Sequence, residues 1–137
     1  MFLKSEPLKH NGASVTLYEL SALQRIEHLE YLKKIEAVEE GDIQTAMETT
    51  VRGSAFVVAM SLWHAHALKG TLPGGVAEEV KKIQDEVLST WPLEVLALAE
   101  YRIKILSGML PPPEDVPEPE SDVQAEPVTA EKSSPAS

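Results

Sequence analysis

The sequence predicts a mainly α protein, a small domain of about four helices with a short N-terminal β-hairpin, followed by a disordered acidic tail. Three observations predict this fold class. Apolar residues recur at helical spacing in segments separated by glycine and proline, and an Asn-Gly pair lies between two short apolar runs near the start. Seven of the ten prolines fall within residues 111–137. We therefore expect a helical domain over residues 1–110 and a Pro/Glu-rich tail over residues 111–137.

The N-terminal segment is typical of a β-hairpin. Asn11-Gly12 is the dipeptide best able to adopt the positive φ angles of a type I′ turn, and Leu8, Val15 and Leu17 are apolar residues of the two expected strands. An isolated hairpin is only marginally stable in water, so it packs on helices of its own domain or joins the sheet of a partner. We favour packing within the domain.

The first helix is expected to begin near residue 16, because residues 16–19 (Thr-Leu-Tyr-Glu) have the pattern of a capping box. The apolar residues that follow recur every three positions, so that successive side chains are rotated by about 60° around the helix axis. No single flat contact can bury them all. Either the segment breaks into a turn followed by a helix, or neighbours contact it from several sides. The residues are Leu20, Leu23, Ile26, Leu29, Leu32 and Ile35.

The second helix is predicted to be the core helix. Asp42 suits its N-cap, and the helix should run to about Ala67, with Gly70 closing it. From Ala55 to Trp63 apolar side chains lie all around the helix axis, which predicts burial on most sides.

The third helix follows a loop over residues 71–75 and is predicted to be an ordinary surface helix. Its inward face consists of Val76, Val80, Ile83 and Val87. Charged residues are expected to cover the remaining surface, namely Glu78, Glu79, Lys81, Lys82, Asp85 and Glu86.

The fourth helix is predicted to start after Pro92, which ends the third helix at or just before Trp91. It should run to Ser107, with Gly108 as its stop. Two apolar stripes lie on it. One consists of Val95, Leu96, Ala99, Ile103 and Leu106. The other consists of Leu98, Tyr101 and Ile105, and it either packs inside the domain or receives an amphipathic helix of a partner.

The histidines and carboxylates do not predict an active site, and the sequence has no cysteine. His64 and His66 are two residues apart, so on a helix they point about 200° apart and cannot chelate one metal ion as an i, i+4 pair can. We expect one to be buried and hydrogen-bonded and the other to lie near the surface, and we rank a metal-dependent enzyme last. Paired carboxylates such as Glu78-Glu79 are expected on a solvated helix face. We predict no enzyme, no metal and no cofactor.

Charge and hydropathy limit the class of partner. Residues 1–110 contain 15 acidic and 11 basic residues, and residues 111–137 contain seven acidic residues and one basic residue. No basic patch with interleaved aromatic residues predicts nucleic-acid binding. The longest uncharged stretch, residues 53–68, is too short and too polar to predict a membrane span. The first residues lack a signal-peptide pattern, which predicts the cytoplasm. The acidic tail either binds a basic partner or keeps the protein soluble.

Several runs of residues resemble one protein family along nearly the whole chain. On these runs the sequence is similar to the minor tail protein G family, the tail assembly chaperones of lambda-like long-tailed phages. The region from Glu36 to Thr50 departs most. The matching runs are Phe2 to Lys4, His10 to Gly12, Glu19 to Leu29, Ala55 to His64, Glu86 to Leu88, Thr90 to Pro92, Leu106 to Met109 and Ala125 to Val128.

The resemblance implies a non-catalytic assembly factor. In that family the G protein coats the tape-measure protein and keeps its apolar helical regions soluble. A programmed ribosomal frameshift extends a fraction of G into a G-T fusion, whose T part recruits the major tail (tube) protein. The resemblance therefore implies these two partners, several copies with self-association, a location in the host cytoplasm and absence from the mature virion. A structural minor tail component retained in the virion is the alternative.

The position of the frameshift follows from the same resemblance. In the family it falls at a Gly-Lys pair near the C-terminus, and the aligned pair in this sequence is Glu131-Lys132. Glutamate in place of glycine changes the codon expected in the slippery sequence.

Overall fold

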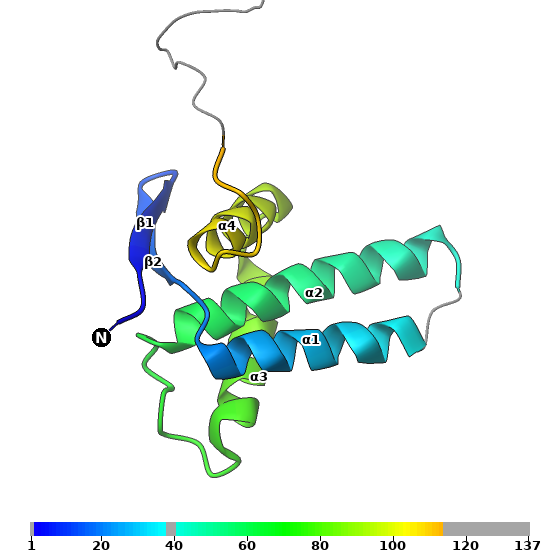
Figure 1. Cartoon of the computed structure of the whole chain (residues 1–137), viewed down its shortest axis with the longest axis horizontal. Coiled ribbons are helices and arrows are strands. Elements are labelled where there is room, and N and C mark those ends of the chain that lie inside the picture. Colours follow the sequence, from blue (N-terminus) through cyan, green and yellow to red (C-terminus); the bar gives the residue numbers. More distant parts are fainter. Residues whose placement is uncertain (1, 38–40, 114–137) are drawn as a thin grey trace, which may run out of the picture.

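The computed structural model describes residues 2–37 and 41–113, and within them the chain forms two strands and four helices (Figure 1). The strands are β1 (Ser5–His10) and β2 (Ala13–Tyr18). The helices are α1 (Ala22–Ala37), α2 (Ile43–Trp63), α3 (Gly75–Thr90) and α4 (Leu93–Leu106). The predicted mainly α class with an N-terminal hairpin is confirmed.

The predicted tail lies almost wholly outside the described residues. Of residues 111–137, only 111–113 are described, so Glu131 and Lys132 lie beyond them. The division of the chain near residue 110 stays a prediction. Within the described residues, no helix combines the length and the apolar character that crossing a membrane requires.

β1 and β2 pair antiparallel along their whole length. Asn11 and Gly12 join them with φ angles of +50° and +81°, the left-handed values that the predicted type I′ turn needs. Leu17 of β2 is fully buried in the domain core. Ser61 of α2 holds the end of the same strand, because its Oγ accepts a hydrogen bond from Tyr18 N (2.7 Å) and donates one to Tyr18 O (2.8 Å). The hairpin therefore packs on its own domain.

α1 begins later than the sequence predicted. Thr16 lies in β2, so the capping box predicted at residues 16–19 does not form. A second box follows at residues 21–24, where Gln24 Oε1 accepts a hydrogen bond from Ser21 N (3.0 Å) and Ser21 Oγ accepts one from Gln24 N (3.2 Å). Pairing with β1 keeps the chain extended as far as Tyr18, and the helix therefore starts at the second box.

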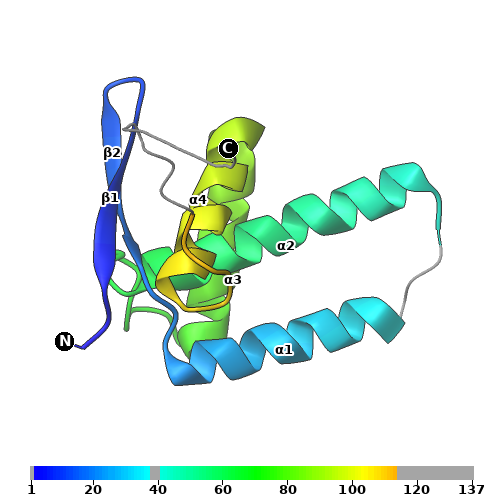
Figure 2. The ribbon, with the colours of Figure 1, turned by 45° about the horizontal axis from the view of Figure 1, so that its top comes forward.

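α2 is the central helix, as predicted. Asp42 caps its start, since Asp42 Oδ1 accepts a hydrogen bond from Thr45 N (2.9 Å). The hairpin, α3 and α4 contact α2 around its C-terminal half (Figure 2). The burial of this shared apolar cluster is the main stabilising contribution to the fold. The cluster consists of Leu17, Leu20, Ala55, Val57, Val58, Ala59, Met60, Val80, Ile83, Val87, Leu96, Ala99 and Ile103.

The end of α2 and the position of Glu79 both differ from the prediction. α2 ends at Trp63 rather than near Ala67, and the following loop leaves amide groups that need acceptors. The Glu79 carboxylate accepts hydrogen bonds from Leu72 N (3.0 Å), Trp63 Nε1 (2.9 Å) and Gly70 N (3.1 Å). Together these bonds lower the pKa of Glu79 to about 2, although burial acts in the opposite direction. Glu79 was predicted to face solvent but is only 1% exposed.

α3 buries Val80, Ile83 and Val87 as predicted. Val76 was predicted to share this face but is exposed, because it lies in the first turn of the helix beside the loop, beyond the buried part of the face. α3 ends at Thr90, and Pro92 precedes α4 in an extended conformation. The boundary predicted from this proline is confirmed.

The end of α4 lies where the sequence predicted it from Gly108. Gly108 has a φ of +73°, the left-handed conformation that glycine adopts without strain. Its N–H donates to Ile105 O (3.1 Å), and Met109 N donates to Lys104 O (2.8 Å), which is the Schellman pattern of hydrogen bonds.

Candidate partner-binding surfaces

The outer face of α4 consists of Leu98, Tyr101 and Ile105, the second stripe that the sequence indicated. The structure buries the first stripe at Val95, Leu96, Ala99 and Ile103. On the opposite side Leu98 is 45% exposed and Tyr101 is 43% exposed, while Ile105 is half-buried. The three side chains fall within about 60° of one another around the helix axis. The α4 outer face is therefore a narrow apolar stripe that is accessible to solvent.

Polar contacts on both sides of this stripe hold α4 in place. Arg102 Nε and Nη2 donate to the two carboxylate oxygens of Glu6 in β1 (2.7 and 3.0 Å). This hydrogen bonding lowers the pKa of Glu6 and raises that of Arg102. On the side of α2, Glu100 accepts a hydrogen bond from Ser54 Oγ (2.7 Å) and forms an ion pair with Lys104 (2.9 Å). The stripe is thus presented by a helix that is fixed to two neighbours.

The end of α4 is also joined to the start of α1. Ser107 Oγ accepts a hydrogen bond from Leu20 N (2.9 Å), and Ser107 O accepts one from Arg25 Nη1 (2.7 Å). These contacts link residues that are more than 80 positions apart in the sequence. They fix the first turn of α1 against the domain.

α1 exposes more large apolar side chains than the α4 outer face does. Its two faces are inverted relative to an ordinary surface helix, because polar side chains are buried against the domain and apolar side chains face solvent. Gln24 and His28 are buried against the domain, and Tyr31 stacks on Phe56 of α2 with ring centroids 4.5 Å apart. The apolar side chains point away from α2 and are exposed. We call these residues the α1 outer face: Leu23, Ile26, Leu29 and Leu32.

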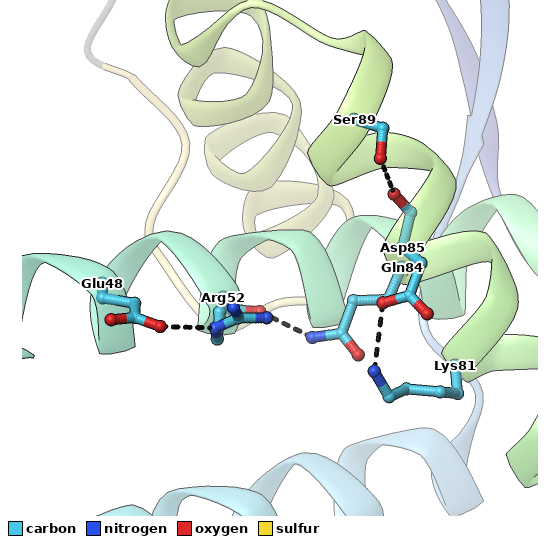
Figure 3. A network of polar contacts seen from close by, with 6 residues as sticks. All are labelled: Glu48, Arg52, Lys81, Gln84, Asp85 and Ser89. Atoms are coloured by element: carbon cyan, nitrogen blue, oxygen red, sulfur yellow. Dashed lines mark hydrogen bonds and ion pairs between the residues drawn. The ribbon is translucent and has the colours of Figure 1, made fainter.

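A groove lies beside the N-terminal half of α2, with a volume of about 630 Å³. Ile43, Met47 and Val51 of α2 and Leu88 of α3 line it, with Glu48 and Arg52 among its polar residues. We call it the α2 groove. Figure 3 shows its polar border, where Arg52 Nε donates to Glu48 Oε2 (3.1 Å) and Gln84 Nε2 of α3 donates to Arg52 O (2.9 Å).

The two histidines that the sequence singled out have separate partners. His64 Nε2 donates to Gln24 Oε1 (2.8 Å), and His66 Nε2 donates to Glu86 Oε1 (3.1 Å). Burial lowers the pKa of His64, and the positive charge of Lys69 lowers it further. In the part of the chain that the structure describes, no group of three His, Asp or Glu side chains is placed to hold a metal ion.

The sequence reasoning identified the α4 stripe but missed the α1 outer face as an exposed surface. The signal was the rotation of about 60° between successive apolar residues of α1, which indicated contacts from several sides. Within the described residues these contacts are not all made by the domain itself, because four of the apolar side chains remain exposed.

A folded helical domain that leaves whole helix faces apolar and exposed has a surface typical of proteins that bind other polypeptides. Comparison with known proteins gives the family. Residues 1–126 match the model of the family described as bacteriophage lambda tail assembly chaperone, TAC, protein G. The chain belongs to this family, and the resemblance seen in the sequence is confirmed.

The relatives come in two lengths. Tail assembly protein G of Escherichia phage N15 is 61% identical over the whole of both chains, and that of Escherichia phage lambda is 48% identical over 98% of both. Tail assembly protein GT of phage N15 is 61% identical over 96% of this chain, but the match spans only 54% of GT. No solved structure is significantly similar to this chain.

Proposed function

We propose that this chain is a non-enzymatic tail assembly chaperone that binds the tape-measure protein and keeps it soluble in the host cytoplasm. The observation that carries the proposal is the α4 outer face, an apolar and exposed stripe on a domain of the tail assembly chaperone family. Apolar segments of a long helical client associate with one another in water. A helix face of this kind protects such a segment by covering its apolar side.

The shape of the α4 outer face favours it as the site for a single client helix. Leu98, Tyr101 and Ile105 lie within about 60° of one another, so one helix packed along α4 contacts all three. The apolar residues of the α1 outer face, in contrast, span about 180°, and no single helix covers that range. Tyr101 adds a large ring with a polar end, a residue type enriched where binding energy is concentrated.

Co-expression with the tape-measure protein tests this proposal. We expect the tape-measure protein to remain soluble and to co-elute with this chain. Leu98→Glu and Tyr101→Glu should each reduce the recovered complex by about tenfold or more, because a carboxylate in an apolar contact loses its hydration. Leu93→Glu is the matched control, since Leu93 is 63% exposed on another side of the same helix.

Two outcomes would contradict the proposal at different levels. If the tape-measure protein precipitates equally with and without this chain, the chaperone function is wrong. If it stays soluble with wild-type chain and with both α4 variants, the function stands and the α4 outer face is not the binding site.

We further propose a G-T extension that helps to recruit the major tail protein. The support is that the chain corresponds to about half of the GT relatives, 54% of the one from N15 and 48% of the one from lambda. The proposed frameshift position, Glu131 and Lys132, lies outside the described residues. Mass spectrometry of infected cells should detect a longer product whose peptides change reading frame near these codons. Detection of only the shorter product would reject the extension.

The alternative is a structural minor tail component that stays in the particle. A chaperone acts during assembly and leaves, so purified virions should contain no peptides of this chain. Its presence in virions at a fixed number of copies would favour the structural role.

A further inference from the structure

The backbone groups of the hairpin point alternately in two directions. Glu19 N donates to Lys4 O (2.9 Å), so this pair directs its backbone groups across the hairpin. Tyr18 points outward instead, because its N–H and C=O bond Ser61 Oγ of α2. In an antiparallel pair every second residue repeats the direction. The outer edge of β2 therefore consists of the N–H and C=O groups of Ser14, Thr16 and Tyr18.

This outer edge is open toward the hairpin turn. Within the described residues, the N–H and C=O groups of Ser14 and Thr16 bond no protein group, and both residues are exposed. The outer edge of β1 differs, since Pro7 has no N–H and Lys9 follows it, two features that protect edge strands from further pairing. β2 has neither feature. Its two free donors and two free acceptors are a template for one more strand.

Two small pockets lie beside the open edge. The first, of about 330 Å³, lies between Val15 and Thr16 of β2 and the C-terminal ends of α2 and α3. The second, of about 250 Å³, lies between Ala13 and the junction of α3 and α4 at Pro92. Val15 and Trp91 line both, so the pockets are neighbours. Figure 2 shows the hairpin turn at the same end of the domain as this junction. We call them the edge pocket and the tip pocket.

We propose that the outer edge of β2 binds an extended segment of a different polypeptide as a third, antiparallel strand, with a lysine in the edge pocket and an aliphatic side chain in the tip pocket. The residues of this strand opposite Thr16 and Ser14 exchange four main-chain hydrogen bonds with them. Leu17 is buried in the core, so Val15 and Ala13 on the same face of β2 also point toward the domain. The residues opposite these two point inward as well, toward the two pockets.

Charge favours a lysine in the edge pocket. Glu86 lines it and is more than half exposed, and Glu86 Oε1 lies 3.1 Å from His66 Nε2. Within the described residues, Glu86 Oε2 has no donor. The stem of a lysine packs along Leu62 and Val87, while its ammonium group reaches Glu86 Oε2. An aliphatic side chain in this pocket leaves the Glu86 carboxylate without a new partner.

The tip pocket favours an aliphatic side chain instead. Leu8 of β1, Pro92 and Val95 of α4 are among the apolar residues that line it. A strand that runs against β2 passes Val15 before Ala13, so the lysine precedes the aliphatic residue by two positions. The residues between and before them face solvent and suit threonine. The partner segment therefore has the pattern Thr-Lys-Thr-Val.

Another copy of this chain does not supply such a strand. In β1 and β2 the inward-facing positions between outward-pointing residues contain no lysine. These positions are Glu6, Leu8, Val15 and Leu17. The strand therefore comes from a different polypeptide. The proposed contact uses no residue of the α4 outer face, so it can be tested without the tape-measure protein.

Isothermal titration calorimetry of the full chain with the capped peptide acetyl-Ser-Thr-Lys-Thr-Val-Ser-amide tests the proposal. We expect saturable binding of one peptide per chain. In NMR spectra the amide signals of Ser14 and Thr16 should shift and gain protection from hydrogen exchange, because their N–H groups acquire acceptors. Absence of saturable binding at every soluble peptide concentration would overturn the proposal.

N-methylation of the peptide tests its backbone register. A methyl group on the amide nitrogen of either threonine should weaken binding by more than about tenfold, because these N–H groups donate to Thr16 O and Ser14 O. N-methylation of the lysine should have little effect, since its N–H points away from β2. Equal losses at the three positions would overturn the added strand. Equal or tighter binding of the peptide with the order Val-Thr-Lys-Thr would overturn the antiparallel direction.

A charge variant tests the lysine. Glu86→Gln should weaken binding of the lysine peptide by about three- to fivefold, since it removes one partly exposed ion pair. It should not change the binding of a peptide with norleucine in place of lysine. Asp85→Asn is the matched control, because it makes the same change of charge at an exposed neighbour that lines neither pocket. Equal losses for the two variants would reject the pairing of lysine with Glu86.

Discussion

α1 and α3 are helices of equal length, 16 residues each, and both pack on α2, but they do so with opposite faces. α3 buries Val80, Ile83 and Val87 and turns most of its charged side chains to solvent. α1 buries Gln24 and His28 and turns leucine and isoleucine to solvent. The difference teaches that the domain itself buries the apolar face of α3, whereas the apolar face of α1 remains exposed to solvent.

The two helices are also held by different forces. α3 is held by apolar burial, which contributes about 1.5–3 kcal/mol for each large side chain. α1 is held by hydrogen bonds at its N-terminal end and by the stacking of Tyr31 on Phe56. A hydrogen bond contributes only about 0.5–1.5 kcal/mol net. We therefore expect α1 to open more readily than α3 in the isolated chain.

The largest effect should come from truncating the buried face of α3. Ile83 is fully buried, and Ile83→Ala should lower the free energy of unfolding by about 2–5 kcal/mol through lost burial and the cavity left behind. Leu29→Ala on the α1 outer face should change it by less than about 0.5 kcal/mol. Urea denaturation of the monomeric chain measures both. Comparable losses for the two variants would show that α1 is covered within its own domain.

The next largest effect should come from the polar face of α1. Gln24 Nε2 donates to Met60 O (2.8 Å), and Gln24 Oε1 accepts from Ser21 N and His64 Nε2. Gln24→Ala should cost about 1–3 kcal/mol, because it leaves buried polar partners without hydrogen bonds. Amide hydrogen exchange should show the loss of protection mainly in α1. An unchanged exchange rate in α1 would mean that these hydrogen bonds do not hold the helix.

Acid should release α1 before it releases α3. Burial lowers the pKa of His28 below its usual 6.5, with smaller effects of the charges on Lys104, Glu100 and Arg25. The unfolded chain therefore binds more protons than the folded chain just below pH 6.5. The contribution of neutral His28 to the free energy of unfolding is therefore complete above that pH and falls as the pH drops. The pKa of Glu79 is lowered from 4.5 to about 2, so its contribution at α3 is lost only between those values.

Hydrogen exchange at a series of pH values, corrected for intrinsic rates, measures the two windows separately. Protection of α1 should begin to fall below about pH 6.5, while that of α3 should persist to about pH 4.5. His28→Gln should reduce the first step, to which His64 also contributes because its pKa is lowered and it bonds Gln24 of α1, and should leave the second step unchanged. Simultaneous loss of protection in both helices near pH 6 would contradict the assignment of the α1 window to His28 and of the α3 window to Glu79.

The contrast between α1 and α3 shows how far the sequence could predict the fold. Asp42, Pro92 and Gly108 marked helix ends correctly, because caps and breakers act through hydrogen bonds and sterics within a few residues. The buried stripe of α4 was also correct, since one side of that helix meets α2. In these places the local pattern and the tertiary contacts agree.

The errors occur where a distant residue decides the outcome. Glu79 is buried because the loop after α2 presents amide groups to it, and no periodicity in α3 contains that information. For α1 the apolar pattern predicted either a break or contacts from several sides. The fold instead buries Gln24, which donates a hydrogen bond to Met60 O of α2, and leaves four apolar side chains exposed. The α2 groove was not predicted, since it needs Leu88 of α3 beside Met47.

The smallest effect should come from the surface charges of α3. Lys81 and Asp85 form an i, i+4 ion pair of 3.0 Å, but both side chains are more than half exposed (Figure 3). Water and salt screen such a pair, so Lys81→Ala should change the free energy of unfolding by less than about 0.5 kcal/mol. Urea denaturation at low and at high salt should give the same difference within error. A loss as large as that of Ile83→Ala would mean that charge rather than burial holds α3, and the distinction between the two helices would then fail.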